Sequence, residues 1–155
     1  MNEMGRKHPV HQPVQYRFNT PVIVFLTVCT KNRKSILANE PAHQLLLEAW
    51  NTADSWNVGR YVVMPDHVHL FCAPATQLAP SLTQWVNFWK SSAARCWPCA
   101  ADAPIWQRQF WDTQLRRADS YVAKWSYVAQ NPERAGFVAA GQHWPYQGEM
   151  HVLRW

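Results

Sequence analysis

Two short groups of residues have the composition of a chemical site. His67 and His69 are two positions apart in an apolar run, and in a β-strand such positions point to the same face. Two imidazoles placed about 7 Å apart along one face can bind a single divalent ion. Tyr127 and Asn131 are four positions apart, which puts them on the same face of a helix. These patterns predict a metal site and a tyrosine nucleophile with an amide beside it.

Each group alone also has an ordinary structural interpretation. Histidine pairs often bind nothing, and a tyrosine on an amphipathic helix is usually part of the core. A tyrosine hydroxyl, whose ordinary pKa is about 10, becomes a covalent nucleophile where a neighbouring group helps to remove its proton. A bound metal ion supplies that help and polarises the phosphate under attack. The chemistry therefore requires the two groups to meet in the fold.

Apolar periodicity predicts the elements that carry these groups, in the order β-α-β-β-α-β-α. The expected strands cover residues 22–30, 59–64, 67–73 and 105–115, and the expected helices cover residues 41–56, 81–96 and 119–130. This order is typical of an α+β, ferredoxin-like split β-α-β fold, a four-stranded antiparallel sheet with helices on one face.

Local signals mark the ends of the expected helices. Pro41 suits a first helical turn, and Ser81 followed by Gln84 has the pattern of a capping box. Asp119 or Ser120 is the expected N-cap of the last helix, which should end at Asn131-Pro132 because a residue before proline leaves the helical region. The tail after residue 133 is expected to be irregular or partly strand.

Composition limits the class of protein. The chain has 155 residues, 48% of them hydrophobic, which fits one globular domain with a real core. Its formal net charge of +5 favours a polyanionic partner. The best apolar run, residues 22–29, is far shorter than the ~20 residues that span a bilayer, and the N-terminus lacks the apolar segment of a signal peptide. We therefore expect an intracellular protein, with no membrane partner.

The four cysteines suggest no framework of disulfides. Cys29 and Cys72 lie in apolar strand-like runs and are expected to be buried free thiols. Cys96 and Cys99 form a single CxxC pair, without the second pair or nearby histidines that a zinc site needs. Reduced cysteines are the favoured interpretation.

Three segments together resemble one known family. Residues 61–69 match the pattern Y-x-x-M-P-[DN]-H-x-H of the single-tyrosine HUH transposases. Residues 106–112 resemble the W-x-x-x-[FY]-[WY]-[DE] segment of the REP-associated tyrosine transposases, and residues 127–138 are similar to Y-x-x-x-N-P-V-[RK]-A-G-[LY]-V of that branch. The resemblance covers roughly residues 16–140 in the right order, and three linked motifs are far more specific than one. Glu133 and Phe137 depart from the pattern but lie after the tyrosine.

The resemblance implies a mechanism and an assignment for each site residue. His67, His69 and Asn131 would bind Mg²⁺ or Mn²⁺, with Gln130 as a substitute for Asn131, and Tyr127 would be the catalytic nucleophile. The family cleaves single-stranded DNA, forms a 5′-phosphotyrosine link and rejoins strands without ATP. Its REP-associated branch acts on short palindromic DNA hairpins in bacteria, which implies a cytoplasmic, nucleoid-associated protein. Asp66 either orients one histidine or only forms the turn before it, and the turn role is favoured.

Further predictions concern the DNA contacts and the division of the chain. Basic side chains would bind phosphates, and the candidates are Arg33, Lys34, Lys90, Arg95, Arg108, Arg116 and Arg117. We divide the chain into an N-terminal extension at residues 1–20, a catalytic domain at residues 21–140 and a C-terminal tail at residues 141–155. A monomer and a homodimer both fit the sequence.

Two other functions fit parts of the pattern. A ferredoxin-like module that binds nucleic acid without chemistry would use the same strands and aromatic side chains as a stacking platform. A zinc or redox protein would be centred on Cys96 and Cys99. A covalent adduct between Tyr127 and DNA separates the enzyme from the first alternative, and bound zinc would support the second.

Overall fold

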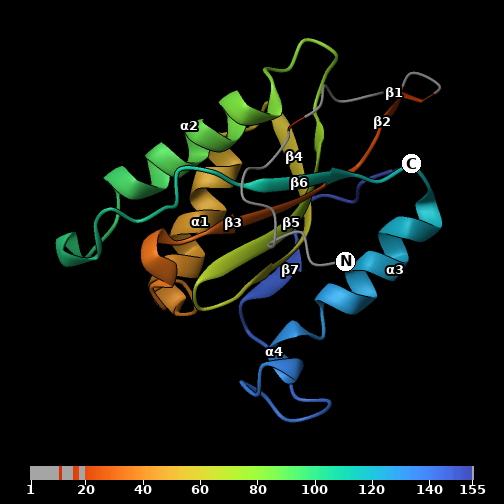
Figure 1. Ribbon diagram of the computed structural model, residues 1–155. Helices are drawn as coiled ribbons and strands as arrows, with labels where there is room; N and C mark the ends of the chain where they lie inside the picture. Colours follow the sequence, from red (N-terminus) through yellow and green to blue (C-terminus); the bar gives the residue numbers. More distant parts are fainter. Residues whose placement is uncertain (1–10, 12–15, 18–19, 155) are drawn as a thin grey trace.

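The computed structural model describes residue 11, residues 16–17 and residues 20–154 (Figure 1). Its centre is a five-stranded antiparallel sheet with the strand order β6-β3-β5-β4-β7. The strands are β3 (Val24–Cys29), β4 (Trp56–Val63), β5 (His67–Pro74), β6 (Trp111–Gln114) and β7 (Gln147–Glu149). The α-helices are α1 (Glu40–Thr52), α2 (Leu82–Arg95), α3 (Ala118–Val128) and α4 (Asn131–Arg134). Two short strands, β1 (Tyr16–Arg17) and β2 (Thr20–Pro21), pair with each other, and 3₁₀ turns cover Lys31–Arg33 and Ala100–Asp102.

Helices cover both faces of the sheet. Val24, Leu26 and Leu70 belong to a core that also contains Trp50 of α1 and Trp89 of α2. The alternate strand positions, among them Phe25 and Phe71, form a second core against Tyr121 and Trp125 of α3. Figure 1 shows α1 and α2 on one side of the sheet and α3 on the other. The predicted α+β fold is confirmed. The predicted placement of the helices on one face holds for α1 and α2, whereas α3 covers the other face.

The first two helices begin as the sequence predicts. The Asn39 side chain accepts a hydrogen bond from the Ala42 amide and caps α1, whose first turn contains Pro41. Ser81 and Gln84 form both hydrogen bonds of the capping box at the start of α2. The helix predicted for residues 41–56 is shorter at its C-terminal end, because Trp56 begins β4.

Strands β4 and β5 form the predicted hairpin around Pro65 and Asp66. The Met64 amide donates to the His67 carbonyl oxygen (2.8 Å) and closes the turn. Between Val58 and Tyr61 the register of β4 against β5 shifts, as a β-bulge does. The hairpin therefore places His67 at the very start of β5, directly after the turn.

The fourth expected strand is much shorter than predicted. Only Trp111–Gln114 form β6, and Trp106 makes one isolated bridge to Thr30. The reason lies in Lys90, whose ammonium takes the carbonyl oxygens of Gln107 (2.7 Å) and Arg108 (3.5 Å) as acceptors. These two carbonyls are therefore turned away from a neighbouring strand, although the Gln107 amide still donates to the Cys29 carbonyl oxygen (3.0 Å).

The last helix differs from the prediction at both ends. It begins at Ala118 with Arg117 as its N-cap, so neither Asp119 nor Ser120 has that place. It ends at Val128, where the Gln130 amide bonds to the Tyr127 carbonyl in a tighter turn (3.3 Å). Asn131 then begins α4, because a proline is tolerated in a first helical turn.

The tail, expected to be irregular or partly strand, contributes a strand that makes the sheet five-stranded where four strands were predicted. Residues 147–149 of β7 pair with residues 60–62 of β4. This strand is short and contains Gly148, so it lacks the apolar alternation by which strands are recognised. Of the predicted N-terminal extension, residues 1–10, 12–15 and 18–19 lie outside the described residues.

Candidate active site

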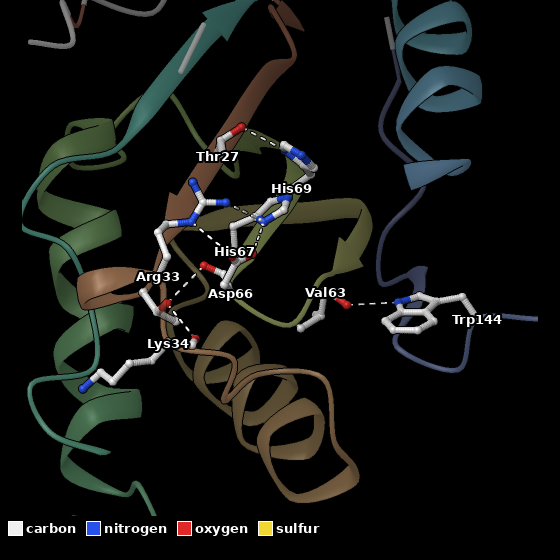
Figure 2. Close-up of polar contacts among 9 residues, drawn as sticks. Thr27, Arg33, Lys34, Val63, Asp66, His67, His69 and Trp144 are labelled. Atoms are coloured by element: carbon white, nitrogen blue, oxygen red, sulfur yellow. Dashed lines mark hydrogen bonds and ion pairs between the residues drawn. The ribbon is translucent and has the colours of Figure 1, made fainter. Parts of the chain in front are cut away.

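The two histidines lie side by side on one face of β5. Their ring centroids are 4.7 Å apart, with the rings nearly perpendicular. Figure 2 shows the pair between Thr27 on one side and Asp66 with Arg33 on the other. The strand alternation that brings them to one face also brings Phe71 there, in the core beneath α3. The predicted shared face of His67 and His69 is therefore confirmed.

Asp66 joins His67 to a basic residue of the neighbouring turn. Its carboxylate accepts from His67 Nδ1 (2.7 Å) and from Arg33 Nε (3.0 Å). The hydrogen bond from His67, with that from Arg33, lowers the pKa of Asp66 to about 2. Because Nδ1 of His67 donates to a carboxylate, the neutral form of this ring has its lone pair on Nε2. Asp66 thus forms the turn and also orients the histidine ring.

His69 has a different partner on the next strand. Its Nδ1 lies 2.9 Å from the Thr27 hydroxyl oxygen, and Thr27 is the residue directly opposite on β3. Burial lowers the pKa of His69 well below its usual value, and the charges of His67, Lys124, Arg33 and Arg134 add to that effect. The ring is therefore neutral, as a metal-binding imidazole must be.

Helix α3 brings an ammonium group to the same face. Lys124 Nζ lies 4.7 Å above the centroid of the Phe25 ring. The Phe25 ring is itself stacked on His69, with centroids 5.2 Å apart. The helix that carries Tyr127 thus packs over the histidine face of the sheet.

Tyr127 and Asn131 are linked by a third residue, Arg134. The Arg134 guanidinium carbon lies 3.9 Å from the centroid of the Tyr127 ring, in a cation–π contact. The same guanidinium donates to the Asn131 amide oxygen. Tyr127 is 63% exposed, so it is not the core residue that an amphipathic helix would suggest. Gln130, the predicted substitute for Asn131, is exposed in the turn between α3 and α4.

The site offers few negatively charged side chains as ligands for a cation. Within the described part of the chain, no three His, Cys, Asp or Glu side chains gather as a metal-binding cluster. The imidazoles of His67 and His69 share one face and carry no negative charge. Such a set leaves most of a divalent ion's charge for an anionic substrate.

The candidate DNA-contacting residues are scattered over the sequence and differ in exposure and in their contacts. Exposed side chains in this set are Arg33, Arg95, Arg108, Arg116 and Arg117. Arg33 is also paired with Asp66. Lys34 donates to the carbonyl oxygens of Asp102 and Pro104 and so ties its turn to the loop after α2.

Lys90 does not fit its predicted role. It is only 6% exposed, and its ammonium donates to backbone carbonyls in the interior. Burial lowers its pKa to about 8. We therefore interpret Lys90 as a structural cation and leave it out of the DNA-contacting set.

None of the four cysteines is in a disulfide bond, as predicted. Cys29 and Cys72 are buried, and Cys96 and Cys99 are exposed at the end of α2 and beyond it. Among the described residues, no histidine or carboxylate completes a metal cluster with the CxxC pair. The structure therefore gives no support to a zinc centre there.

Three residues of this site were not among the sequence-based candidates. Lys124 and Arg134 had a readable signal, because helical residues three positions apart share a face. Lys124 precedes Tyr127 by three positions, and Arg134 follows Asn131 by three. Thr27 had none, because its place opposite His69 depends on the register between β3 and β5.

Comparison with known proteins identifies the family. The model of the family described as IS200-like transposases matches residues 20–124, more than half of the chain. The chain belongs to the IS200-like transposase family. The match includes His67 and His69 and ends at Lys124, before Tyr127 and Asn131. This IS200-like protein is therefore a DNA transposase at the level of its family.

Individual relatives agree with the resemblance predicted from the motifs. The chain is 26% identical over 125 residues to the REP-associated tyrosine transposase of Escherichia coli K12, covering 79% of this chain and 73% of the relative. The solved structure of a REP-associated tyrosine transposase bound to a REP hairpin has a TM-score of 0.70 at 22% identity, over 89% of this chain and 82% of that one. A putative transposase from Deinococcus radiodurans has a TM-score of 0.51 at 20% identity, over 81% and 96%. These structures share the fold, and the predicted family resemblance is confirmed.

No helix among the described residues is both long and apolar enough to cross a membrane.

Proposed function

We propose that this IS200-like transposase cleaves and rejoins single-stranded DNA at hairpins that resemble REP palindromes, through a covalent 5′-phosphotyrosine on Tyr127. The observation that carries the proposal is the His67–His69 pair. Each ring has its Nδ1 beside a protein partner, Asp66 or Thr27, which leaves both Nε2 atoms for one cation. The helix carrying Tyr127 packs over the same face of the sheet.

The residues present fit a divalent metal ion, Mg²⁺ or Mn²⁺. His67 and His69 would hold it through Nε2, and the Asn131 amide oxygen, which has a second lone pair beside its bond to Arg134, would be the third protein ligand. When bound, the ion polarises the phosphate and lowers the cost of deprotonating the nucleophile. Asp66 and Thr27 orient the two rings, as partners of metal-binding histidines commonly do.

The chain's own residues account for the covalent step. The Tyr127 hydroxyl loses its proton to solvent, and its oxygen attacks the scissile phosphorus. An O–P bond forms to the tyrosine, the bond to the 3′ oxygen breaks, and that oxygen takes up a proton as a 3′ hydroxyl. Because one phosphodiester replaces another, the bond energy is retained and a second 3′ hydroxyl can reverse the step with a new strand.

The positive charge of the site and its similarity to a hairpin-bound relative both favour a DNA hairpin as the substrate. A relative of the same fold was solved bound to a REP hairpin. The side chains around His69 include the cations Arg33, Lys124 and Arg134, an arrangement that suits a phosphodiester. Arg95, Arg108, Arg116 and Arg117 are exposed and would add phosphate contacts, which would hold the protein at the bacterial nucleoid.

The experiment is a cleavage assay on single-stranded hairpin DNA, with and without Mg²⁺ or Mn²⁺, resolved on a denaturing protein gel. We expect a metal-dependent protein–DNA adduct that is absent in Tyr127→Phe. This substitution removes one hydroxyl oxygen and keeps the ring on which Arg134 rests, so the variant is a matched control for folding.

His67→Ala provides the second arm. It should abolish the adduct and leave hairpin binding intact, because most phosphate contacts lie elsewhere. Loss of binding as well would make the histidines structural. Binding by the wild type without any adduct, across many hairpins and both metals, would favour a nucleic-acid-binding module without chemistry.

A further inference from the structure

Lys124 lies on the helix that carries Tyr127 and reaches the face of the sheet that carries the two histidines. It precedes Tyr127 by three positions on α3, so the two side chains project from neighbouring parts of the helix surface. Its ammonium lies over the Phe25 ring at 4.7 Å, and that ring is stacked on His69 at 5.2 Å. The nucleophile's helix and the metal-binding strand are thus joined through Lys124 and Phe25.

Lys124 differs from the other two cations near His69 in what it binds. Arg33 is engaged by the Asp66 carboxylate, and Arg134 donates to Asn131 while resting on Tyr127. Among the side chains that the structure describes, which exclude Ala118 and Asp119 at the start of α3, neither a hydrogen bond nor an ion pair engages the Lys124 ammonium, whose contact is with an aromatic face. It therefore keeps three N–H donors for a ligand.

A half-buried ammonium with free donors is suited to an anion. The Phe25 ring attracts the positive charge but accepts no conventional hydrogen bond, so the N–H donors stay available to a ligand. The Asp66 carboxylate, which contacts the histidine pair, is already bound to His67 and Arg33. A phosphate oxygen would satisfy both the charge and the donors of Lys124.

We propose that Lys124 is a further catalytic residue, which binds a non-bridging oxygen of the scissile phosphate beside the histidine pair. The inference rests on the proposed function. Lys124 forms and breaks no covalent bond. Its charge opposes the negative charge that accumulates on that oxygen as the Tyr127 oxygen approaches phosphorus, and because one helix carries both side chains, the contact also aligns the nucleophile.

The test uses Lys124→Met and Lys124→Arg in the full chain. Methionine keeps the apolar contact with the Phe25 ring and removes the charge, whereas arginine restores a cation. Arg154→Met, an exposed position outside the proposed site, controls for the loss of one positive charge. Thermal denaturation of all variants checks that they are folded.

The first readout is binding, measured in a Tyr127→Phe background so that no strand is cut. The logarithm of the affinity for a single-stranded hairpin oligonucleotide is followed against the logarithm of salt concentration. Lys124→Met should reduce the slope by about 1, the loss of one phosphate contact, while Arg154→Met leaves it unchanged.

The second readout is the rate of adduct formation with Tyr127 intact, on substrates with either phosphorothioate isomer at the scissile position. Lys124→Met should slow the reaction about 10²–10³-fold, and Lys124→Arg should recover most of it. Sulfur in place of the contacted oxygen should slow the wild type, and that penalty should vanish in Lys124→Met because the contact is already lost.

The outcomes separate this inference from the proposed function. An unchanged salt slope together with the same phosphorothioate penalties in wild type and Lys124→Met would overturn the role of Lys124 while leaving the Tyr127 chemistry in place. If the wild type forms no adduct, the proposed function fails, and the salt slope alone decides whether Lys124 binds phosphate.

Discussion

Replacing Thr27 by valine should disturb the histidine pair without touching either histidine. Thr27 is 3% exposed on β3, and its hydroxyl is 2.9 Å from Nδ1 of His69 on the neighbouring strand. Valine has nearly the same shape and suits a strand, so packing is retained. What is lost is one hydrogen-bond partner of a ring whose pKa is strongly lowered by burial.

The size of the effect follows from that single contact. Leaving a buried polar atom without a partner costs about 1–3 kcal/mol. His69 is only half-buried, so water can replace part of the bond, and we expect about 1–2 kcal/mol. For a domain of this size, that loss lowers the melting temperature by about 2–8 °C. The ring also loses the partner that directs Nε2 to a metal, which should weaken metal binding about 10–100-fold.

The assay pairs thermal denaturation with calorimetric titration of Mn²⁺. Thr27→Ser is the matched control, because it deletes the methyl group and retains the hydroxyl, so it should lose some stability and keep the metal affinity. Unchanged melting temperature and unchanged Mn²⁺ affinity in Thr27→Val would refute the argument that this hydroxyl orients His69. A stability loss without any change in affinity would limit Thr27 to a structural role.

Two further predictions concern the interior and the C-terminal segment. Burial lowers the pKa of Lys90 from its ordinary 10.5 to about 8. Between these pH values the unfolded chain binds more protons than the folded one, so rising pH stabilises the folded protein. Relative to Lys90→Met, the wild type should gain about 3 kcal/mol of unfolding free energy from pH 7.5 to pH 10.5, measured as a rising difference in melting temperature; a constant difference would contradict the burial argument. At Gly59, an added Cβ would lie 2.6 Å from Leu153 Cδ1 and 3.1 Å from the Tyr121 hydroxyl. Gly59→Ala should therefore cost about 1–3 kcal/mol in denaturant unfolding, and Leu153→Ala in the same chain should recover most of that loss; equal losses in the single and double variants would show that the C-terminal segment does not press on β4.

Much of the fold could be predicted because the signals are local. The apolar alternation of β3 and β5, the capping box at Ser81 and Pro41 in the first turn of α1 all follow from neighbouring residues. Where a distant group competes, the local signal fails. The strand expected at residues 105–115 is shortened because Lys90 takes two of its carbonyl oxygens, and β7 exists only because the edge of β4 accepts it.

The same division applies to the candidate site. The sequence alone determined that His67 and His69 share a face, because the period of a strand is two, and its three motifs identified the family. Only the tertiary structure decided that Thr27 is opposite His69 and that Arg134 links Tyr127 to Asn131. It also decided that Lys124 reaches the histidine face while Lys90 is buried. The reason is physical: a short-range pattern fixes where a side chain points along its own element, whereas register and helix packing fix what it meets there.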